Sequence, residues 1–222
     1  MRIGLFGGTF NPFHSGHLRA CQDVVSRFHL DRMILIPAAI PPHKSGQGLA
    51  SPEDRLEMLR LATARFSDMV VSDIELTRPG PSYTVDTLIF YRHEFPDTDN
   101  LFLVVGLDAF LEFHTWKRWE TILKTVAILV MERPGDYGGE AIDKRLLFDA
   151  YIRKRFGYDL HLQDGQPSVY HHLLYHPVML TPVDSPDISS SRIRQMIRDC
   201  QSIQSVAPES VARYISEKGL YR

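Results

Sequence analysis

The stretch that most constrains the fold is residues 3–17, where an apolar segment is followed by two glycines, a proline-containing turn and two histidines. The apolar segment predicts a buried strand, and from Ser15 onward apolar residues recur at helical spacing. A helix start offers unpaired backbone N–H groups and the positive end of the helix dipole, which suits this junction to a phosphate. The glycines allow close approach of the backbone, and His14 and His17 add hydrogen-bond donors.

The alternation of strand and helix continues along the chain. Further buried strands are expected over residues 32–36, 69–71, 101–105, 126–131 and 178–180. Helices are expected to start near residues 15, 52, 84, 119, 189 and 208. This alternation predicts an α/β protein with a doubly wound parallel sheet and right-handed crossovers.

The strand order decides where a ligand would bind. If the order is 3-2-1-4-5, the first and fourth strands are neighbours at the point where the order reverses, and ligands bind beyond their carboxyl ends. The first of these strands ends in residues 7–17, and the fourth ends in Gly106-Leu107-Asp108. Two motifs far apart in sequence are therefore predicted to meet at one crevice.

The pattern lapses over residues 136–176, which we interpret as an insertion on the main sheet. A helix is expected over 140–156, with Leu146, Leu147 and Ile152 on its buried face. Residues 185–222 are expected to form a small helical C-terminal part. Length favours one domain over residues 1–222.

Composition argues against several classes of function. A formal net charge of −2 gives no general attraction for nucleic acid or an anionic membrane. No run has the unbroken apolar length of a membrane span, and the N-terminus enters a core strand without the pattern of a signal peptide. Cys21 and Cys200 lie far apart and are expected to be free thiols. We therefore expect a cytoplasmic protein that binds neither nucleic acid nor membrane; no pattern indicates an oligomeric state.

The spacing of His14 and His17 also has two other interpretations, half of a zinc site or a pair of histidines that cap a helix or pack in the core. No Cys, Asp or Glu stands nearby at ligand spacing, so no protein-bound metal is expected there. The glycines, the proline and the strand-to-helix context favour nucleotide binding.

Residues 8–17, Gly-Thr-Phe-Asn-Pro-Phe-His-Ser-Gly-His, resemble the GTFxPxHxGH signature of the Rossmann-like nucleotidyltransferase superfamily. Other stretches resemble one branch, the bacterial nicotinate-nucleotide adenylyltransferases of NAD synthesis. In chain order these are Pro41-Pro42-His43-Lys44, residues 82–88, Gly106-Leu107-Asp108-Ala109, Thr115-Trp116, Arg133-Pro134-Gly135 and residues 188–194. The insertion at 136–176 is longer than is usual in that branch.

The resemblance implies roles for individual residues. It implies that His14, His17, Lys44 and Arg194 carry the reaction. For ATP binding it implies Gly8, Thr9, Phe10, Gly106, Asp108, Ile188, Ser189, Ser190 and Ser191. For the nicotinate nucleotide it implies His43, Tyr83, Thr84, Trp116, Lys117 and Arg133, with the Trp116 ring stacked on the cationic pyridine.

The reaction implied is adenylyl transfer from ATP to nicotinate mononucleotide, giving nicotinate adenine dinucleotide and pyrophosphate. The attacking phosphate is already an anion, because its second pKa is about 6, so no general base is needed. Mg²⁺ is expected as the cofactor, bound mainly through phosphate oxygens and water. Two alternatives stay open: a sister enzyme with nicotinamide mononucleotide or another small phosphate as acceptor, and a non-catalytic nucleotide-binding module.

Overall fold

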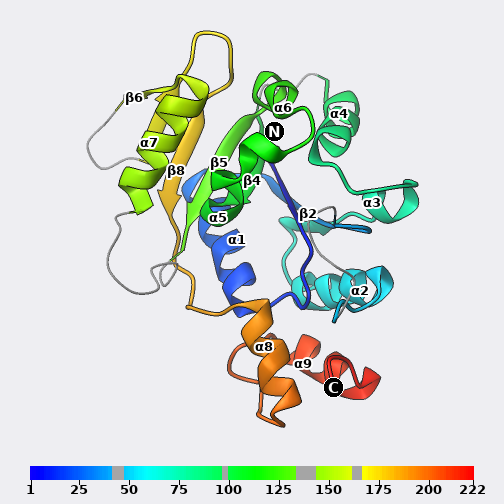
Figure 1. Cartoon of the computed structure of the whole chain (residues 1–222). Helices are drawn as coiled ribbons and strands as arrows, with labels where there is room; N and C mark the ends of the chain where they lie inside the picture. The colour runs from blue at the N-terminus through cyan, green and yellow to red at the C-terminus, as the bar shows by residue number, and fades with distance from the viewer. Residues whose placement is uncertain (42–47, 97–99, 134–143, 162–166) are drawn as a thin grey trace.

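The computed structural model describes residues 1–41, 48–96, 100–133, 144–161 and 167–222. These residues form one eight-stranded sheet in the order β3-β2-β1-β4-β5-β8-β7-β6 (Figure 1). The strands are β1 (Ile3–Gly8), β2 (Arg32–Pro37), β3 (Met69–Val71), β4 (Leu101–Gly106), β5 (Ala127–Glu132), β6 (Asp159–His161), β7 (Ser168–His171) and β8 (Val178–Pro182). The predicted order 3-2-1-4-5 is confirmed, because β1 pairs in parallel with both β2 and β4.

The helices lie mostly where the apolar spacing predicts them. They are α1 (Ser15–Arg27), α2 (Pro52–Thr63), α3 (Ile74–Thr77), α4 (Thr84–Glu94), α5 (Leu107–Leu111), the 3₁₀ turn η1 (Phe113–Thr115), α6 (Trp119–Thr125), α7 (Lys144–Phe156), α8 (Ser190–Arg198) and α9 (Glu209–Lys218). The one-turn helix α3 was not predicted. It follows β3 directly and occupies residues that were assigned partly to a loop.

Helices cover both faces of the sheet, as the continuous apolar strands require. Alternate residues of each strand point to opposite faces, so Phe6 packs in one core cluster and its neighbours Ile3 and Leu5 pack in the other. Residues of α1, α2 and α9 complete the first cluster. Residues of α4, α5, α6 and α7 complete the second.

The described part of the insertion extends the sheet and adds one helix. Strand β7 pairs antiparallel with both β6 and β8, so the parallel sheet acquires an antiparallel edge. The predicted helix face was wrong in part: Ile152 is buried as predicted, but Leu146 is 68% exposed and Leu147 is also exposed, and Phe148 and Phe156 are buried in their place. Both sets have helical spacing, and the packing of α7 against α5 selects the aromatic one.

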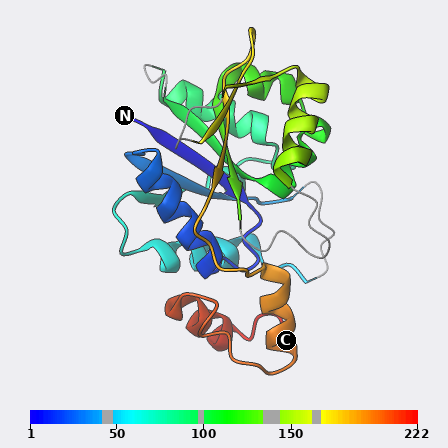
Figure 2. The same ribbon diagram turned by 90° about the vertical axis from the view of Figure 1, so that its left-hand side faces the viewer.

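The C-terminal part consists of α8 and α9, which lie together at one end of the molecule in both views (Figures 1 and 2). Helix α9 packs on α2 and buries Val211 and Ile215. Among the described ranges, none of the helices has the length and apolarity that crossing a bilayer requires. The assignment of residues 1–222 to one domain stays a prediction.

Candidate active site

A cavity of about 1050 Å³ opens at the carboxyl ends of β1 and β4. It brings the two predicted motifs together, since residues of the turn after β1 and of the start of α5 line the same space. The predicted ATP-side residues that line it are Gly8, Thr9, Phe10, His14, His17, Gly106, Asp108, Ser189, Ser190, Ser191 and Arg194. Their binding roles stay predictions.

The histidine pair forms a reciprocal cap at the start of α1. His14 is the N-cap residue; its Nδ1 accepts a hydrogen bond from the His17 N–H, and Nδ1 of His17 accepts one from the His14 N–H, both at 3.3 Å. A neutral imidazole that accepts at Nδ1 carries its proton on Nε2. The cap therefore fixes the tautomer of both rings and leaves each with an Nε2–H donor. Capping, one of the alternatives considered above, is compatible with a role in binding phosphate.

The same turn keeps His14 uncharged. The residue is only 1% exposed, and burial, assisted by the positive charge of Arg133, lowers the pKa of His14 to about 3 from an ordinary value of 6.5. At neutral pH the ring therefore acts as a neutral hydrogen-bond donor rather than as a cation.

This pKa shift predicts how stability changes with pH. The pKa of His14 is lower in the folded chain than in the unfolded chain, so its contribution is complete above pH 6.5 and is lost as the pH falls towards 3. Relative to His14→Asn, which keeps a capping side chain that does not titrate, the wild-type free energy of unfolding should decline by up to about 1.4 kcal/mol per pH unit below 6.5. Urea unfolding at pH 4.5, 5.5 and 7 measures this, and parallel pH profiles of the two proteins would contradict it.

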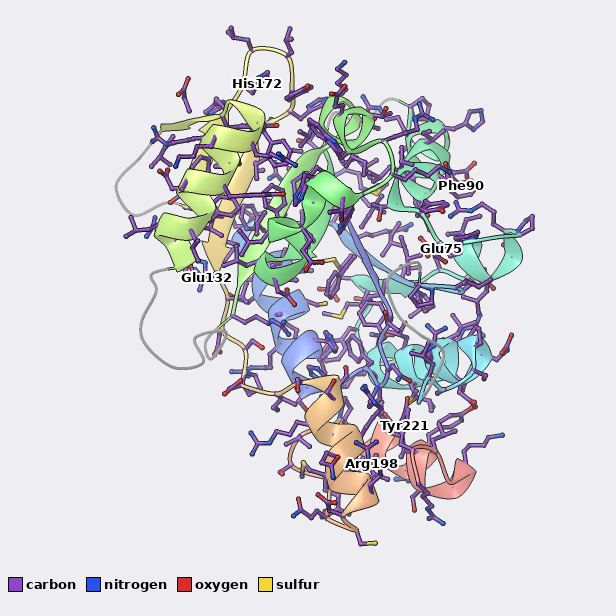
Figure 3. The ribbon with its side chains drawn as sticks, in the orientation of Figure 1. Glu75, Phe90, Glu132, His172, Arg198 and Tyr221 are labelled. Carbon is purple, nitrogen blue, oxygen red and sulfur yellow. The ribbon has the colours of Figure 1, made fainter. Side chains whose placement is uncertain are left out.

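The C-terminal part holds the opening turn in place. The Arg194 guanidinium donates to the Asn11 carbonyl at 2.8 Å, and Ser190 Oγ donates to the Pro12 carbonyl at 2.9 Å. The hydroxyl of Tyr221, labelled in Figure 3, donates to Oδ1 of Asn11 at 2.8 Å. The two parts of the predicted triphosphate site are therefore joined by direct hydrogen bonds.

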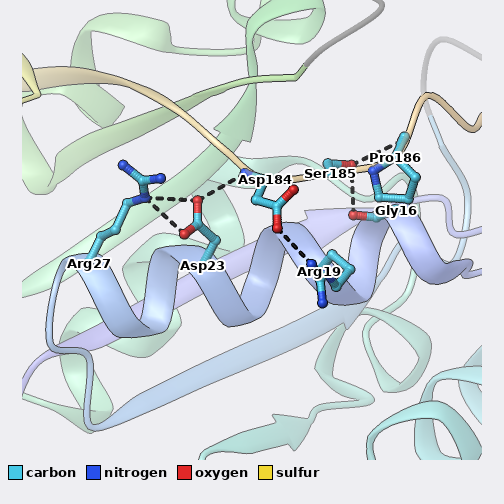
Figure 4. A network of polar contacts seen from close by, with 7 residues as sticks. All are labelled: Gly16, Arg19, Asp23, Arg27, Asp184, Ser185 and Pro186. Carbon is cyan, nitrogen blue, oxygen red and sulfur yellow. Dashed lines mark hydrogen bonds and ion pairs between the residues drawn. The ribbon is translucent and has the colours of Figure 1, made fainter.

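The connection from β8 to α8 lies along α1 (Figure 4). Ser185 Oγ donates to the Gly16 carbonyl at 3.1 Å, the Arg19 guanidinium lies 2.7 Å from the Asp184 carboxylate, and the Asp184 N–H donates to the Asp23 carboxylate at 3.0 Å. These contacts place the start of α8 beside the start of α1.

Helix α8 begins as its serines predict. Ser189 is the N-cap residue and its Oγ accepts from the Arg192 N–H at 3.1 Å, which leaves the first N–H groups of the helix for another acceptor. Ile188 does not line the cavity; its side chain packs against the core. The Ile188 N–H also donates to the Pro186 carbonyl at 2.9 Å, so the ATP contact predicted for Ile188 stays a prediction without support from the cavity lining.

Sequence reasoning missed Arg55, whose side chain is only 1% exposed in α2. Its guanidinium donates to four backbone carbonyls, that of Thr9 in the turn after β1 and those of Ala38, Ala39 and Ala50 in the connection from β2 to α2. Burial lowers the pKa of Arg55 from its ordinary value. Nothing in the local pattern marks a helical arginine as buried, because its acceptors lie in other loops.

Asn11 is a second residue that was not assigned a role. Its side chain is buried, donates to the Gly48 carbonyl at 2.8 Å and accepts from the Ala50 N–H at 2.9 Å. Asn11 and Arg55 together tie residues 48–50 to the turn after β1. The only sign in the sequence of a role for Asn11 was its position within the motif of residues 8–17.

The motif at the end of β4, Gly106-Leu107-Asp108, places the Asp108 carboxylate beside the Arg133 guanidinium. Asp108 and Arg133 lie 3.8 Å apart, and the charge of Arg133 also acts on His14. Arg133 thus lies with the ATP-side residues, although it was assigned to the nicotinate nucleotide. A Cβ at Gly106 would come within 2.7 Å of Asp108 Oδ1, so a larger residue there would displace the Asp108 carboxylate from this position.

The acceptor side is formed by two segments that the sequence predicts separately. The Lys117 ammonium lies 4.1 Å from the centre of the Tyr83 ring and 3.3 Å from the Asp86 carboxylate, which joins the start of α4 to the Trp116-Lys117 segment. Trp116 is half-buried, packs on Phe113 at 5.1 Å between ring centres, and lines the cavity.

The backbone N–H groups of Thr84 and Trp116 differ in whether they are free for a ligand. Thr84 is the first residue of α4, so its N–H lies at the positive end of a helix. The Trp116 N–H, by contrast, donates to the Phe113 carbonyl at 3.0 Å and is already used. His43 and Lys44 lie outside the described residues.

Comparisons with known proteins identify the family and the fold. The cytidylyltransferase-like family model matches residues 5–196. A protein of Desulfatibacillum aliphaticivorans named "probable nicotinate-nucleotide adenylyltransferase" is 39% identical over all of both chains, and one of Geobacter metallireducens with the same name is 40% identical over the whole of this chain and 98% of its own. A solved structure of Plasmodium falciparum nicotinic acid mononucleotide adenylyltransferase complexed with NaAD has the same fold, with a TM-score of 0.71 and 17% identity over 99% of this chain and 97% of that one.

Proposed function

Because this chain belongs to the cytidylyltransferase-like family and, within it, to the nicotinate-nucleotide adenylyltransferases, we propose that it transfers the adenylyl group of ATP to nicotinate mononucleotide in NAD synthesis. An oxygen of the mononucleotide's phosphate bonds to the α-phosphorus of ATP, and the bond from that phosphorus to the pyrophosphate oxygen breaks. The products are nicotinate adenine dinucleotide and pyrophosphate.

The main support for this proposal is a single cavity. It is lined at once by the turn with the His14–His17 cap and by Tyr83, Thr84 and Trp116. Adenylyl transfer needs such a space, since two substrates must be aligned for attack at phosphorus. The attacking phosphate is already ionised near neutral pH, so its alignment matters more than a base.

On the ATP side, His14 and His17 would donate from Nε2–H to the triphosphate. They are suited to this because their tautomers are fixed by the reciprocal cap, so no reorientation is required during the reaction. His14 is uncharged, so positive charge for the phosphates must come from elsewhere. Arg194 would supply it, held in place by its bonds to the Asn11 carbonyl and to Ser191 Oγ.

Mg²⁺ is our proposed cofactor. In the described part of the chain, no three His, Cys, Asp or Glu side chains are grouped to hold a metal, whereas the Asp108 carboxylate lines the cavity. That donor set fits an ion held mainly by phosphate oxygens and water. When bound, Mg²⁺ would offset the negative charge of the triphosphate.

On the acceptor side, Trp116 would stack on the pyridine ring and the start of α4 would bind the nicotinate carboxylate. The Lys117 ammonium adds positive charge at the same place. A neutral carboxamide would gain less from these groups, which supports nicotinate mononucleotide over nicotinamide mononucleotide.

The preference for nicotinate mononucleotide over nicotinamide mononucleotide tests the proposed function. We expect kcat/KM to be at least about ten-fold higher with nicotinate mononucleotide than with nicotinamide mononucleotide, measured by pyrophosphate release with ATP and Mg²⁺. Equal values would contradict the proposed acceptor and favour a sister activity. Binding of ATP without turnover on any phosphate acceptor would establish a non-catalytic module instead.

The cytoplasm is our proposed compartment. The cysteines Cys21 and Cys200 are both free, with Cys21 buried, and this supports a reducing environment.

A further inference from the structure

The segment between α5 and α6 carries the aromatic side chain proposed to stack on the acceptor. Trp116 packs on Phe113, and the carbonyl of Trp116 accepts a hydrogen bond from the Trp119 N–H at 3.2 Å. The position of the Trp116 ring therefore depends on what holds residues 113–119.

Helix α7 of the insertion holds this segment through a tyrosine. The Tyr151 hydroxyl accepts a hydrogen bond from the His114 N–H at 3.1 Å and lies 3.0 Å from His114 Nδ1. Since the oxygen accepts from the amide, its own proton is free to be donated to Nδ1. One hydroxyl thus satisfies both the backbone and the side chain of His114, two residues before Trp116. Burial raises the pKa of Tyr151, so the hydroxyl keeps its proton near neutral pH.

A second contact from α7 supports the same segment. The ring of Phe156 lies 4.9 Å from that of Trp119 and 6.0 Å from that of Phe113, measured between ring centres. Phe148 and Ile152 bury the same helix in the core, so α7 is itself fixed. None of the described α7 residues lines the cavity, so the helix can act on a ligand there only through the residues that it supports.

We propose that α7 is a positioning element for the acceptor nucleotide, with the Tyr151 hydroxyl fixing the 113–116 turn so that the Trp116 ring presents one face to the cavity. The inference rests on the proposed function, because it takes the nicotinate nucleotide as the ligand of Trp116. It gives the insertion a role in substrate binding. The contacts of α7 with His114, Phe113 and Trp119 all support the segment that carries Trp116, so the effect is expected on the acceptor rather than on ATP.

The test compares two tyrosines of the insertion. Tyr151→Phe removes the hydroxyl that supports the turn. Tyr158→Phe is the matched control, because Tyr158 is 1% exposed and its hydroxyl donates to the His176 carbonyl at 2.7 Å rather than to the 113–116 turn. For each protein, the Kd of nicotinate mononucleotide and of ATP is measured by tryptophan fluorescence, together with kcat, both KM values and Tm.

We expect Tyr151→Phe to raise the Kd and KM of nicotinate mononucleotide by about three- to ten-fold and to leave those of ATP within about two-fold. Tyr158→Phe should lower Tm comparably and leave all four constants unchanged. An unchanged acceptor Kd in Tyr151→Phe overturns the inference, and so does an equal rise in both variants, which would indicate general destabilisation.

Failure of the proposed function can be distinguished from failure of the role proposed for Tyr151. If the wild-type chain binds nicotinate mononucleotide but forms no dinucleotide, adenylyl transfer is contradicted, whereas the Kd comparison still decides the role of Tyr151. If the wild-type chain does not bind nicotinate mononucleotide, both proposals are overturned.

Discussion

Replacing His17 by alanine should lower kcat by about 10²- to 10³-fold, the loss typical of one preorganised donor to a developing negative charge. The variant removes the Nε2–H donor whose tautomer is fixed by the cap with His14. Binding of nicotinate mononucleotide should change by less than about three-fold, because the proposed partner of His17 is the triphosphate of ATP and not the acceptor. Steady-state kinetics and an acceptor Kd from fluorescence measure the two effects, and equal losses in both would contradict the assigned role.

A second substitution separates the chemistry of His17 from its structural part. His17 occupies the third position of α1, where glutamine also accepts a hydrogen bond from the N-cap N–H. His17→Gln should therefore recover most of the Tm that His17→Ala loses, while kcat stays at least about ten-fold below wild type. Full recovery of kcat with the cap would show that the histidine serves only to hold the turn.

Replacing Arg55 by methionine should lower the free energy of unfolding by about 3–5 kcal/mol. This is the largest stability effect that we expect from replacing a charged residue of this chain. Methionine fills much of the volume but donates nothing to the partly buried Thr9, Ala38, Ala39 and Ala50 carbonyls, which would lose this donor. Equilibrium unfolding in urea measures the loss.

The control lies on the same helix. Arg60 is about half exposed and lies 3.6 Å from the Asp73 carboxylate in a surface ion pair. Arg60→Met should change the free energy of unfolding by less than about 0.5 kcal/mol. Similar losses for the two variants would mean that the four carbonyl contacts of Arg55 do not hold the loops.

The sheet could be predicted because its signals are local. Apolar strands such as β4 and β5 can lie only where both faces are covered, and the right-handed crossover rule then restricts the strand order. The serine cap of α8 was predictable for the same reason, since Ser189 caps a backbone group three residues away.

What could not be predicted depends on long-range contacts. The burial of Arg55 is decided by carbonyls from two connections, the turn after β1 and the segment from β2 to α2, and Tyr221 reaches Asn11 across most of the chain length. The buried face of α7 was predicted correctly at Ile152 but wrongly at Leu146 and Leu147, because two sets of apolar residues have helical spacing and the packing against α5 selects between them. The reciprocal cap of His14 and His17 was considered only as an alternative to phosphate binding, although the two are compatible.

Transfer of an adenylyl group, rather than a phosphoryl group, is the central claim. It is tested most directly by incubating the wild-type protein with nicotinate mononucleotide, Mg²⁺ and ATP labelled either at the α- or at the γ-phosphorus. The proposed reaction puts the α label into nicotinate adenine dinucleotide and the γ label into pyrophosphate. Transfer of the γ label to the mononucleotide, or failure of either label to leave ATP, would contradict it.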